Sequence, residues 1–132
     1  MYKLAQAGDK LNLTPVWDSK SIMAKFQTPV LYDGYLYTSD QKDLKCVEFM
    51  TGAVKWNKKR VQHGTVVIAD GQLLVLTQDG HLLIAKVSPT GFEPTADVAV
   101  LDGKCWTVPT LVNGKLYVRN LEKVACYDLK AK

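Results

Sequence analysis

The sequence has 132 residues, of which 47% are hydrophobic and 23% are charged, a composition typical of one folded domain and not of a disordered chain. Its 17 Lys and Arg residues against 13 Asp and Glu residues give a net charge of +4, and acidic residues interrupt the basic ones, so we expect no nucleic-acid partner. No apolar run approaches the roughly 18 residues of a membrane-spanning helix, so we expect no membrane span. The first ten residues lack the apolar centre of a signal peptide, so we expect no signal peptide in this sequence.

The first twenty residues predict two short strands. Met1–Leu4 has the composition of the end of one strand, and Leu11–Trp17 predicts a second strand that finishes on a tryptophan. Trp17 precedes Gly34 by 17 residues, much as Trp56 precedes Gly71 by 15, and both glycines belong to the repeats described below. We therefore interpret these strands as the third and fourth strands of a preceding unit.

Three segments then repeat one pattern: an apolar run, an Asp-Gly or Asn-Gly dipeptide, and a second apolar run. The glycines of these dipeptides are Gly34, Gly71 and Gly114, at spacings of 37 and 43 residues. Both residues of such a dipeptide tolerate the positive φ of a type I′ turn, whose twist suits antiparallel strands. Each segment therefore predicts a tight hairpin, and the nearly continuous apolar runs predict strands covered on both faces.

A third strand is predicted about ten residues after each of these glycines, at 44–49, 82–87 and 124–129. Thr51-Gly52 and Thr90-Gly91 then predict turns into fourth strands. The third repeat ends after its third strand.

Four short antiparallel strands in a repeat of about 40 residues are the signature of a β-propeller blade. The sequence therefore predicts an all-β fold with about three blades in an incomplete ring. We assign residues 1–20 to the end of a preceding blade or a clasp strand. The blades are assigned to residues 21–60, 61–103 and 104–132, and the last of them has three strands.

The turn between the third and fourth strands of the first blade carries a longer motif. Residues 46–56 have the sequence Cys-Val-Glu-Phe-Met-Thr-Gly-Ala-Val-Lys-Trp. This segment resembles the A-x-D-x-x-T-G-x-x-x-W hallmark of the quinoprotein-type (PQQ-like) propeller repeat, which it matches at Thr51, Gly52 and Trp56. The resemblance implies that Trp56, and Trp17 before it, dock onto the neighbouring blade.

The sequence departs from that hallmark at two positions, where Glu48 replaces aspartate and Cys46 replaces alanine. The three cysteines form no CxxC pair, so we expect neither a structural zinc site nor a thioredoxin-type site. Cys46 and Cys126 hold matching repeat positions, and with Cys105 they are predicted to be buried free thiols.

Propellers of the quinoprotein type usually have seven or eight blades, so three blades would leave two apolar faces open. Either the chain belongs to a larger propeller, or two copies assemble into a homodimer of about six blades. In the homodimer, the strand around Leu13–Trp17 would complete the fourth-strand edge of the C-terminal blade of the partner copy.

Quinoprotein dehydrogenases bind the quinone PQQ with a calcium ion, often beside adjacent cysteines. This sequence has no adjacent cysteines, and its candidate carboxylates, Asp33, Asp70 and Asp79, are explained by Asp-Gly turns. His63 and His81 lack partners at metal-ligand or general-base spacing and are predicted at the surface. We therefore predict no catalytic residue, no metal site and no cofactor, with PQQ and calcium only under the dehydrogenase alternative.

Three residues are candidates for a binding surface. Arg119 is the one charged residue inside an otherwise apolar second strand, and we expect it either to meet an anionic ligand or to pair with Glu122 or Asp128. Trp106 and Tyr35 are amphipathic aromatics, which serve binding surfaces well and otherwise fill the spaces between blades.

These features favour a non-catalytic interaction or scaffold module over an enzyme. One alternative is a fragment of a PQQ-dependent dehydrogenase, and a second is a carbohydrate- or peptide-binding module that uses aromatic side chains. The family resemblance also implies a periplasmic or otherwise exported protein.

Overall fold

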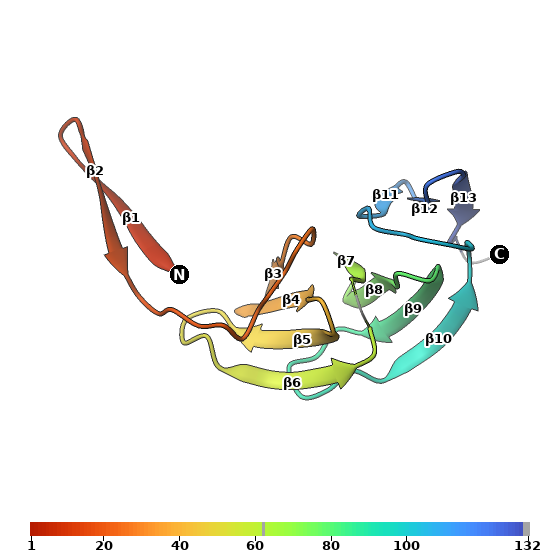
Figure 1. Ribbon diagram of the computed structural model, residues 1–132, viewed down its shortest axis with the longest axis horizontal. Helices are drawn as coiled ribbons and strands as arrows, with labels where there is room; N and C mark the ends of the chain where they lie inside the picture. Colours follow the sequence, from red (N-terminus) through yellow and green to blue (C-terminus); the bar gives the residue numbers. More distant parts are fainter. Residues whose placement is uncertain (62, 131–132) are drawn as a thin grey trace.

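The computed structural model describes residues 1–61 and 63–130, and every regular element in these residues is a β-strand. The strands form four antiparallel sheets, which follow one another along an open arc (Figure 1). The prediction of an all-β, partial propeller is confirmed.

Each sheet is built from strands consecutive in the sequence. The N-terminal hairpin contains β1 (Tyr2–Ala7) and β2 (Lys10–Pro15). Blade 1 contains β3 (Val30–Tyr32), β4 (Tyr35–Ser39), β5 (Asp43–Glu48) and β6 (Val54–Lys59). Blade 2 contains β7 (Thr65–Ala69), β8 (Gln72–Leu76), β9 (His81–Lys86) and β10 (Pro94–Ala99). Blade 3 contains β11 (Thr110–Val112), β12 (Lys115–Arg119) and β13 (Val124–Asp128).

The first two strands of every blade are joined by a two-residue turn. Both turn residues have positive φ in all three cases, at Asp33-Gly34, Asp70-Gly71 and Asn113-Gly114. This conformation defines the type I′ turn, which matches the right-handed twist of the strands on either side. The Asp-Gly and Asn-Gly dipeptides therefore fix the register of each hairpin.

Blade 2 shows why the apolar runs are continuous. Successive side chains of a strand point to opposite faces of its sheet, so Leu73 and Val75 of β8 pack toward blade 1, and Leu74 and Leu76 pack toward blade 3. All four side chains are at most 4% exposed. A blade enclosed on both sides needs apolar residues at every position of its central strands.

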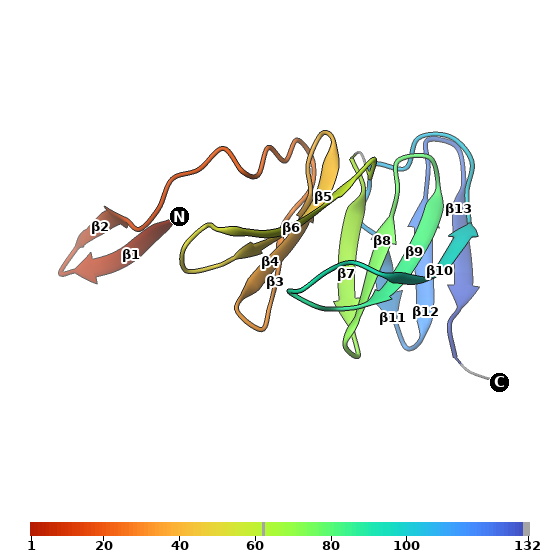
Figure 2. The same cartoon turned by 90° about the horizontal axis from the view of Figure 1, so that it is seen from below.

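The N-terminal hairpin is different, because every residue of β1 and β2 is exposed. The hairpin extends away from the blades, to which a long segment connects it (Figures 1 and 2). β1 and β2 pair from Tyr2 opposite Pro15 to Ala7 opposite Lys10. The first strand is therefore longer than the predicted Met1–Leu4, and the second ends two residues before Trp17.

Candidate interaction surfaces

Two tryptophans join neighbouring sheets in the same way. Trp17 Nε1 donates a hydrogen bond to the carbonyl oxygen of Phe49 at 2.9 Å, and Trp56 Nε1 donates to the carbonyl oxygen of Ser88 at 2.8 Å. Each acceptor lies three residues before the glycine of a Thr-Gly turn, Gly52 or Gly91. The indoles thus connect the hairpin to blade 1 and blade 1 to blade 2, and both N–H groups are used within the chain.

We call each of these tryptophan contacts between neighbouring sheets a tryptophan joint. The joint at Trp17 depends on the absence of a side chain at Gly52. A Cβ atom placed on Gly52 would lie 2.7 Å from Cε3 of Trp17, and the residue has a φ of +75°. Only glycine combines that backbone conformation with so close an approach.

A polar position six residues after each turn glycine caps the loop between the second and third strands. It is occupied by Asp40, Thr77 and Asn120, whose side-chain oxygens accept backbone N–H bonds from the loop that follows. Burial alone would raise the pKa of Asp40, but hydrogen bonds from Lys45 and from the loop N–H groups lower it overall. These side chains stabilise the loops, and the repeat spacing was the signal that would have identified them.

Blades 1 and 3 carry the same tyrosine–cysteine pair in the same register. Tyr37 lies opposite Cys46 in blade 1, and Tyr117 lies opposite Cys126 in blade 3. Tyr37 is 1% exposed and Cys46 is fully buried, because blade 2 covers them. This burial raises the pKa of both groups.

The corresponding face of blade 3 is uncovered in the described residues. Tyr117 is 39% exposed and Cys126 is exposed, so the prediction of a buried thiol was wrong for Cys126. Val112 and Val124 lie on the same side of the sheet, at 48% and 74% exposure. We call this surface, formed by Val112, Lys115, Tyr117, Arg119, Val124, Cys126 and Asp128, the outer face of blade 3.

Arg119 lies on the outer face of blade 3, where it borders a hollow of about 200 Å³ together with Tyr117 and Val124. Its Nη1 donates a 3.3 Å hydrogen bond to the carbonyl oxygen of Asn120. Of the two acidic partners that we considered for it, Asp128 instead forms a 3.3 Å ion pair with Lys115, and no ion pair joins Arg119 to Glu122 in the described residues.

Three aromatic side chains from different blades meet at the opposite edge of the sheets from the hairpin turns. Phe26 and Trp106 stack with ring centroids 5.4 Å apart and an interplanar angle of 27°, and the His63 ring lies 6.4 Å from Phe26 and 6.3 Å from Trp106. We call Phe26, His63 and Trp106 the aromatic cluster. Each stands eight residues before a turn glycine, a regularity in the sequence that we did not use.

The predicted binding residues therefore fall on separate surfaces. Trp106 belongs to the aromatic cluster and Arg119 to the outer face of blade 3. Tyr35 packs partly buried against the core between blades 1 and 2. His63, expected at the surface, is partly buried between the rings of Phe26 and Trp106.

Within residues 1–61 and 63–130, no three His, Cys, Asp or Glu side chains lie close enough together to hold a metal ion. A calcium ion, as in the dehydrogenase alternative, would therefore find no cluster of three such side chains in these residues. The same residues contain no helix that could cross a membrane.

No family model and no curated protein matches the sequence. Solved structures with the same fold do exist. The quinohemoprotein alcohol dehydrogenase ADHIIG from Pseudomonas putida HK5 has a TM-score of 0.64 and 18% identity, over 79% of this chain and 19% of that protein. BamB from Moraxella catarrhalis has a TM-score of 0.62 and 16% identity, over 76% of this chain and 32% of that one.

A third similar structure is the computationally designed Ika4 protein, with a TM-score of 0.70 and 7% identity, over 88% of this chain and 73% of the designed one. The chain spans about a fifth of the length of the dehydrogenase and about a third of the length of BamB. At these identities the similarity establishes a propeller-like fold, and it establishes no activity.

Proposed function

We propose that this chain is a non-catalytic interaction module whose assembling surface is the outer face of blade 3. The observation that carries this proposal is the repeated pair. Tyr37 and Cys46 are buried by a neighbouring blade, whereas Tyr117 and Cys126 occupy the equivalent positions without a cover. A sheet of the same kind as blade 2 fits the outer face of blade 3, because that is how the matching face of blade 1 is covered.

The edge of blade 3 supports the same proposal. In the part of the chain that the structure describes, β13 is paired on one side only, with β12, so its outer backbone groups are open to another strand. In blades 1 and 2 that position is filled by β6 and β10.

The covering blade belongs either to a second copy of this chain or to the rest of a larger propeller. If the cover is a second copy, its β2 is already paired with its β1. The N-terminal hairpin of that copy would therefore add two strands beside β13 of the first copy, whereas the sequence had predicted one. A two-stranded hairpin is marginally stable by itself, and Leu4, Leu11 and Leu13 are 60%, 66% and 67% exposed. Addition to a sheet edge would stabilise the hairpin.

Light scattering tests self-assembly directly. We expect a mass of twice 14.7 kDa at micromolar concentration, and a return to the monomer mass in Tyr117→Glu, because a carboxylate would be buried without a partner at the interface. Tyr32→Glu is the matched control, since Tyr32 is also 39% exposed but lies on β3 of blade 1. Monomer mass at every concentration, or dissociation by both variants, would contradict self-assembly through this face.

Thiol labelling supplies a second measurement on the same samples. Cys126 is exposed in the single chain, whereas Cys46 and Cys105 are buried, and burial raises the pKa of both buried thiols. We expect one fast-reacting thiol in dilute native protein and a slower reaction as concentration rises and the outer face of blade 3 becomes covered. A rate independent of concentration would contradict the proposed interface.

The dehydrogenase alternative and the periplasmic location stay predictions from the family resemblance. Titration with PQQ and calcium, followed by absorbance and by melting temperature, tests the first. A shift in both signals would replace the non-catalytic proposal by the enzymatic one.

A further inference from the structure

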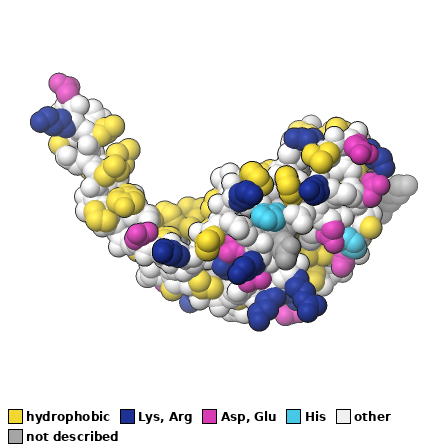
Figure 3. Space-filling model, in the orientation of Figure 1, with side chains coloured by type: hydrophobic (Ala, Val, Ile, Leu, Met, Phe, Trp, Pro, Cys, Tyr) yellow, Lys and Arg dark blue, Asp and Glu magenta, His cyan; other side chains and the backbone are white. Residues whose placement is uncertain are grey.

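The aromatic cluster lies at the edge where the chain enters each innermost strand. Figure 2 shows the entries into β3, β7 and β11 at one edge of the sheets and the three hairpin turns at the opposite edge. On the face that Figure 3 shows, hydrophobic, basic and histidine side chains lie close together near the middle of the arc, at its inner rim. Because Phe26, His63 and Trp106 come from three successive repeats, one ligand here would contact segments leading into all three blades.

Two lysines give the aromatic cluster a positive charge. Lys25 Nζ lies over the Phe26 ring, 5.2 Å from its centroid, and Lys104 Nζ lies 5.1 Å from the centroid of the Trp106 ring. In the described residues the ion pairs of Asp40 and Asp102 are made with Lys45 and Lys123, and none involves Lys25 or Lys104. Their charge is therefore available to an anionic ligand.

Among the described residues, two buried polar atoms at the aromatic cluster have no hydrogen-bond partner: Nδ1 of His63 and Nε2 of Gln27. Gln27 is only 6% exposed, and its Oε1 accepts the backbone N–H groups of Lys25 and Phe26, which holds it beside the aromatic cluster. His63 also has a φ of +48°, a conformation that non-glycine residues seldom adopt. Buried polar atoms are nearly always paired in folded proteins, so these two atoms would gain hydrogen-bond partners if a ligand displaced the side chains that cover them.

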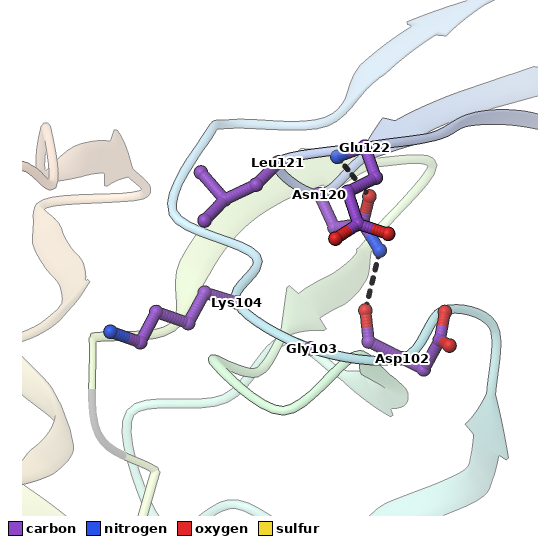
Figure 4. A pocket seen from close by; sticks show the side chains of 6 residues that line it. All are labelled: Asp102, Gly103, Lys104, Asn120, Leu121 and Glu122. Carbon is purple, nitrogen blue, oxygen red and sulfur yellow. Dashed lines mark hydrogen bonds between the residues drawn. The ribbon is translucent and has the colours of Figure 1, made fainter.

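Lys104 also borders a separate hollow of about 340 Å³, which none of the three rings lines. Leu121, which is 71% exposed, stands at its border. Figure 4 shows Lys104 and Leu121 extending to one side of this hollow, and the carboxylates of Asp102 and Glu122 on the other side. An apolar side chain and a cation thus border the same hollow at Leu121 and Lys104, and a second such pair lies at Phe26 and Lys25.

The ring geometry favours a peptide over a saccharide. Sugars bind by stacking on flat aromatic faces, but Phe26 and Trp106 already stack on each other, and the lysines lie over them. The ligand therefore meets ring edges, an apolar leucine and two ammonium groups. Alternating apolar side chains and carboxylates on an extended chain complement that pattern.

We propose that the aromatic cluster, with Lys25, Lys104 and Leu121, binds an acidic peptide segment of a partner protein that carries apolar side chains beside its carboxylates. This proposal rests on the role of the chain as an interaction module, but its residues differ from those of the outer face of blade 3.

The test is titration of the intact chain with the blocked peptide Ac-Phe-Asp-Asp-Phe-Asp-Asp-NH₂, followed by calorimetry and by tryptophan fluorescence. The control peptide has asparagine at every aspartate position. We expect the aspartate peptide to bind at least about tenfold more tightly than the control, and its affinity to fall as salt is added. Equal affinity for both peptides, or no binding of either, would overturn the proposal.

Variants locate the site. The double variant Lys25→Gln with Lys104→Gln should weaken binding about tenfold, and Phe26→Ala should have a similar effect, because each removes a charge or apolar contact from the surface. Lys58→Gln with Lys59→Gln on β6 is the control, which removes the same charge from a distant exposed strand. Equal loss in both double variants would show that only net charge matters and would refute the site.

Two further measurements separate the outcomes. A short oligogalacturonate presents carboxylates on sugar rings, and tighter binding of it than of the peptide would refute the peptide class. The mass of each variant, measured by light scattering, reports assembly through the outer face of blade 3. A variant that loses peptide binding but keeps its assembled mass affects the aromatic cluster alone. A variant that loses assembly but keeps peptide binding affects the outer face of blade 3 alone.

Discussion

The N-terminal hairpin and blade 2 are attached to blade 1 by the same kind of tryptophan joint, yet their surroundings differ. Trp56 lies within a continuous apolar interface, with its ring 6.1 Å from Tyr37 and 5.9 Å from Phe92. Trp17 makes its hydrogen bond and its contact with Gly52 at the end of a hairpin whose residues are all exposed. One joint reinforces a buried core, and the other is the principal contact of an otherwise exposed element.

This difference separates two sources of stability. Between blades 1 and 2, buried apolar area supplies most of the free energy, and the indole hydrogen bond orients the sheets. At the hairpin there is little buried area, so the local geometry around Gly52 determines whether β1 and β2 stay beside blade 1. Substitutions in the core should therefore change global stability, and substitutions at the Trp17 joint should change the hairpin alone.

The largest effect is expected from Leu73→Ala in β8. Leu73 is fully buried between blades 1 and 2, so truncation leaves a cavity and should lower the free energy of unfolding by about 2–5 kcal/mol. Denaturant unfolding measures the loss. Val98→Ala on β10 is the comparison, because Val98 is 51% exposed and lies outside the outer face of blade 3, and it should change stability by less than about 0.5 kcal/mol. Similar losses in both variants would show that the interface between blades 1 and 2 is not the main core.

A smaller and local effect is expected from Gly52→Ala. The new methyl group would overlap the Trp17 ring at a backbone φ of +75°, which should cost about 1–3 kcal/mol and release the hairpin. Limited proteolysis and hydrogen exchange of residues 2–15 should both become faster, while the rest of the chain keeps its protection.

Gly34→Ala is the matched control for that experiment, because Gly34 also has a positive φ, of +80°, and lies in blade 1. No atom lies within 4 Å of a Cβ built on Gly34, so this variant adds the backbone strain without the overlap. It should leave proteolysis of the hairpin unchanged. If both alanine variants release the hairpin equally, contact with Trp17 is not what holds it.

Turn chemistry made much of the fold predictable from the sequence. The Asp-Gly and Asn-Gly dipeptides at Gly34, Gly71 and Gly114 readily adopt the positive φ values of a type I′ turn, so short sequence signals were enough to predict their hairpins. The bounds of β1 and β2 were less predictable, because an exposed hairpin has no buried face to impose an alternating pattern.

The aromatic cluster was only partly predictable for a different reason. Trp106 was identified as a binding candidate, but Phe26 and His63 share its repeat position with different side chains, so residue identity hid the pattern. Their meeting also depends on the angle between successive blades, which no local sequence pattern encodes. The exposure of Cys126 was unpredictable for a similar reason, because it depends on which element, if any, packs against blade 3.

The smallest effect concerns an exposed cross-strand pair that belongs to neither joint. His81 Nδ1 lies 2.7 Å from Asp97 Oδ1, between β9 and β10, and this hydrogen bond raises the pKa of His81. A histidine with a raised folded-state pKa adds stability below its unfolded value of about 6.5. That contribution is lost as pH rises through the raised pKa. Asp97→Asn should therefore return the pKa of His81 toward the ordinary value in an NMR titration, with the melting temperature at pH 8 unchanged. An unaltered pKa would mean that the His81–Asp97 contact does not persist in solution, and a lower melting temperature at pH 8 would assign Asp97 a structural role in blade 2 beyond this pair.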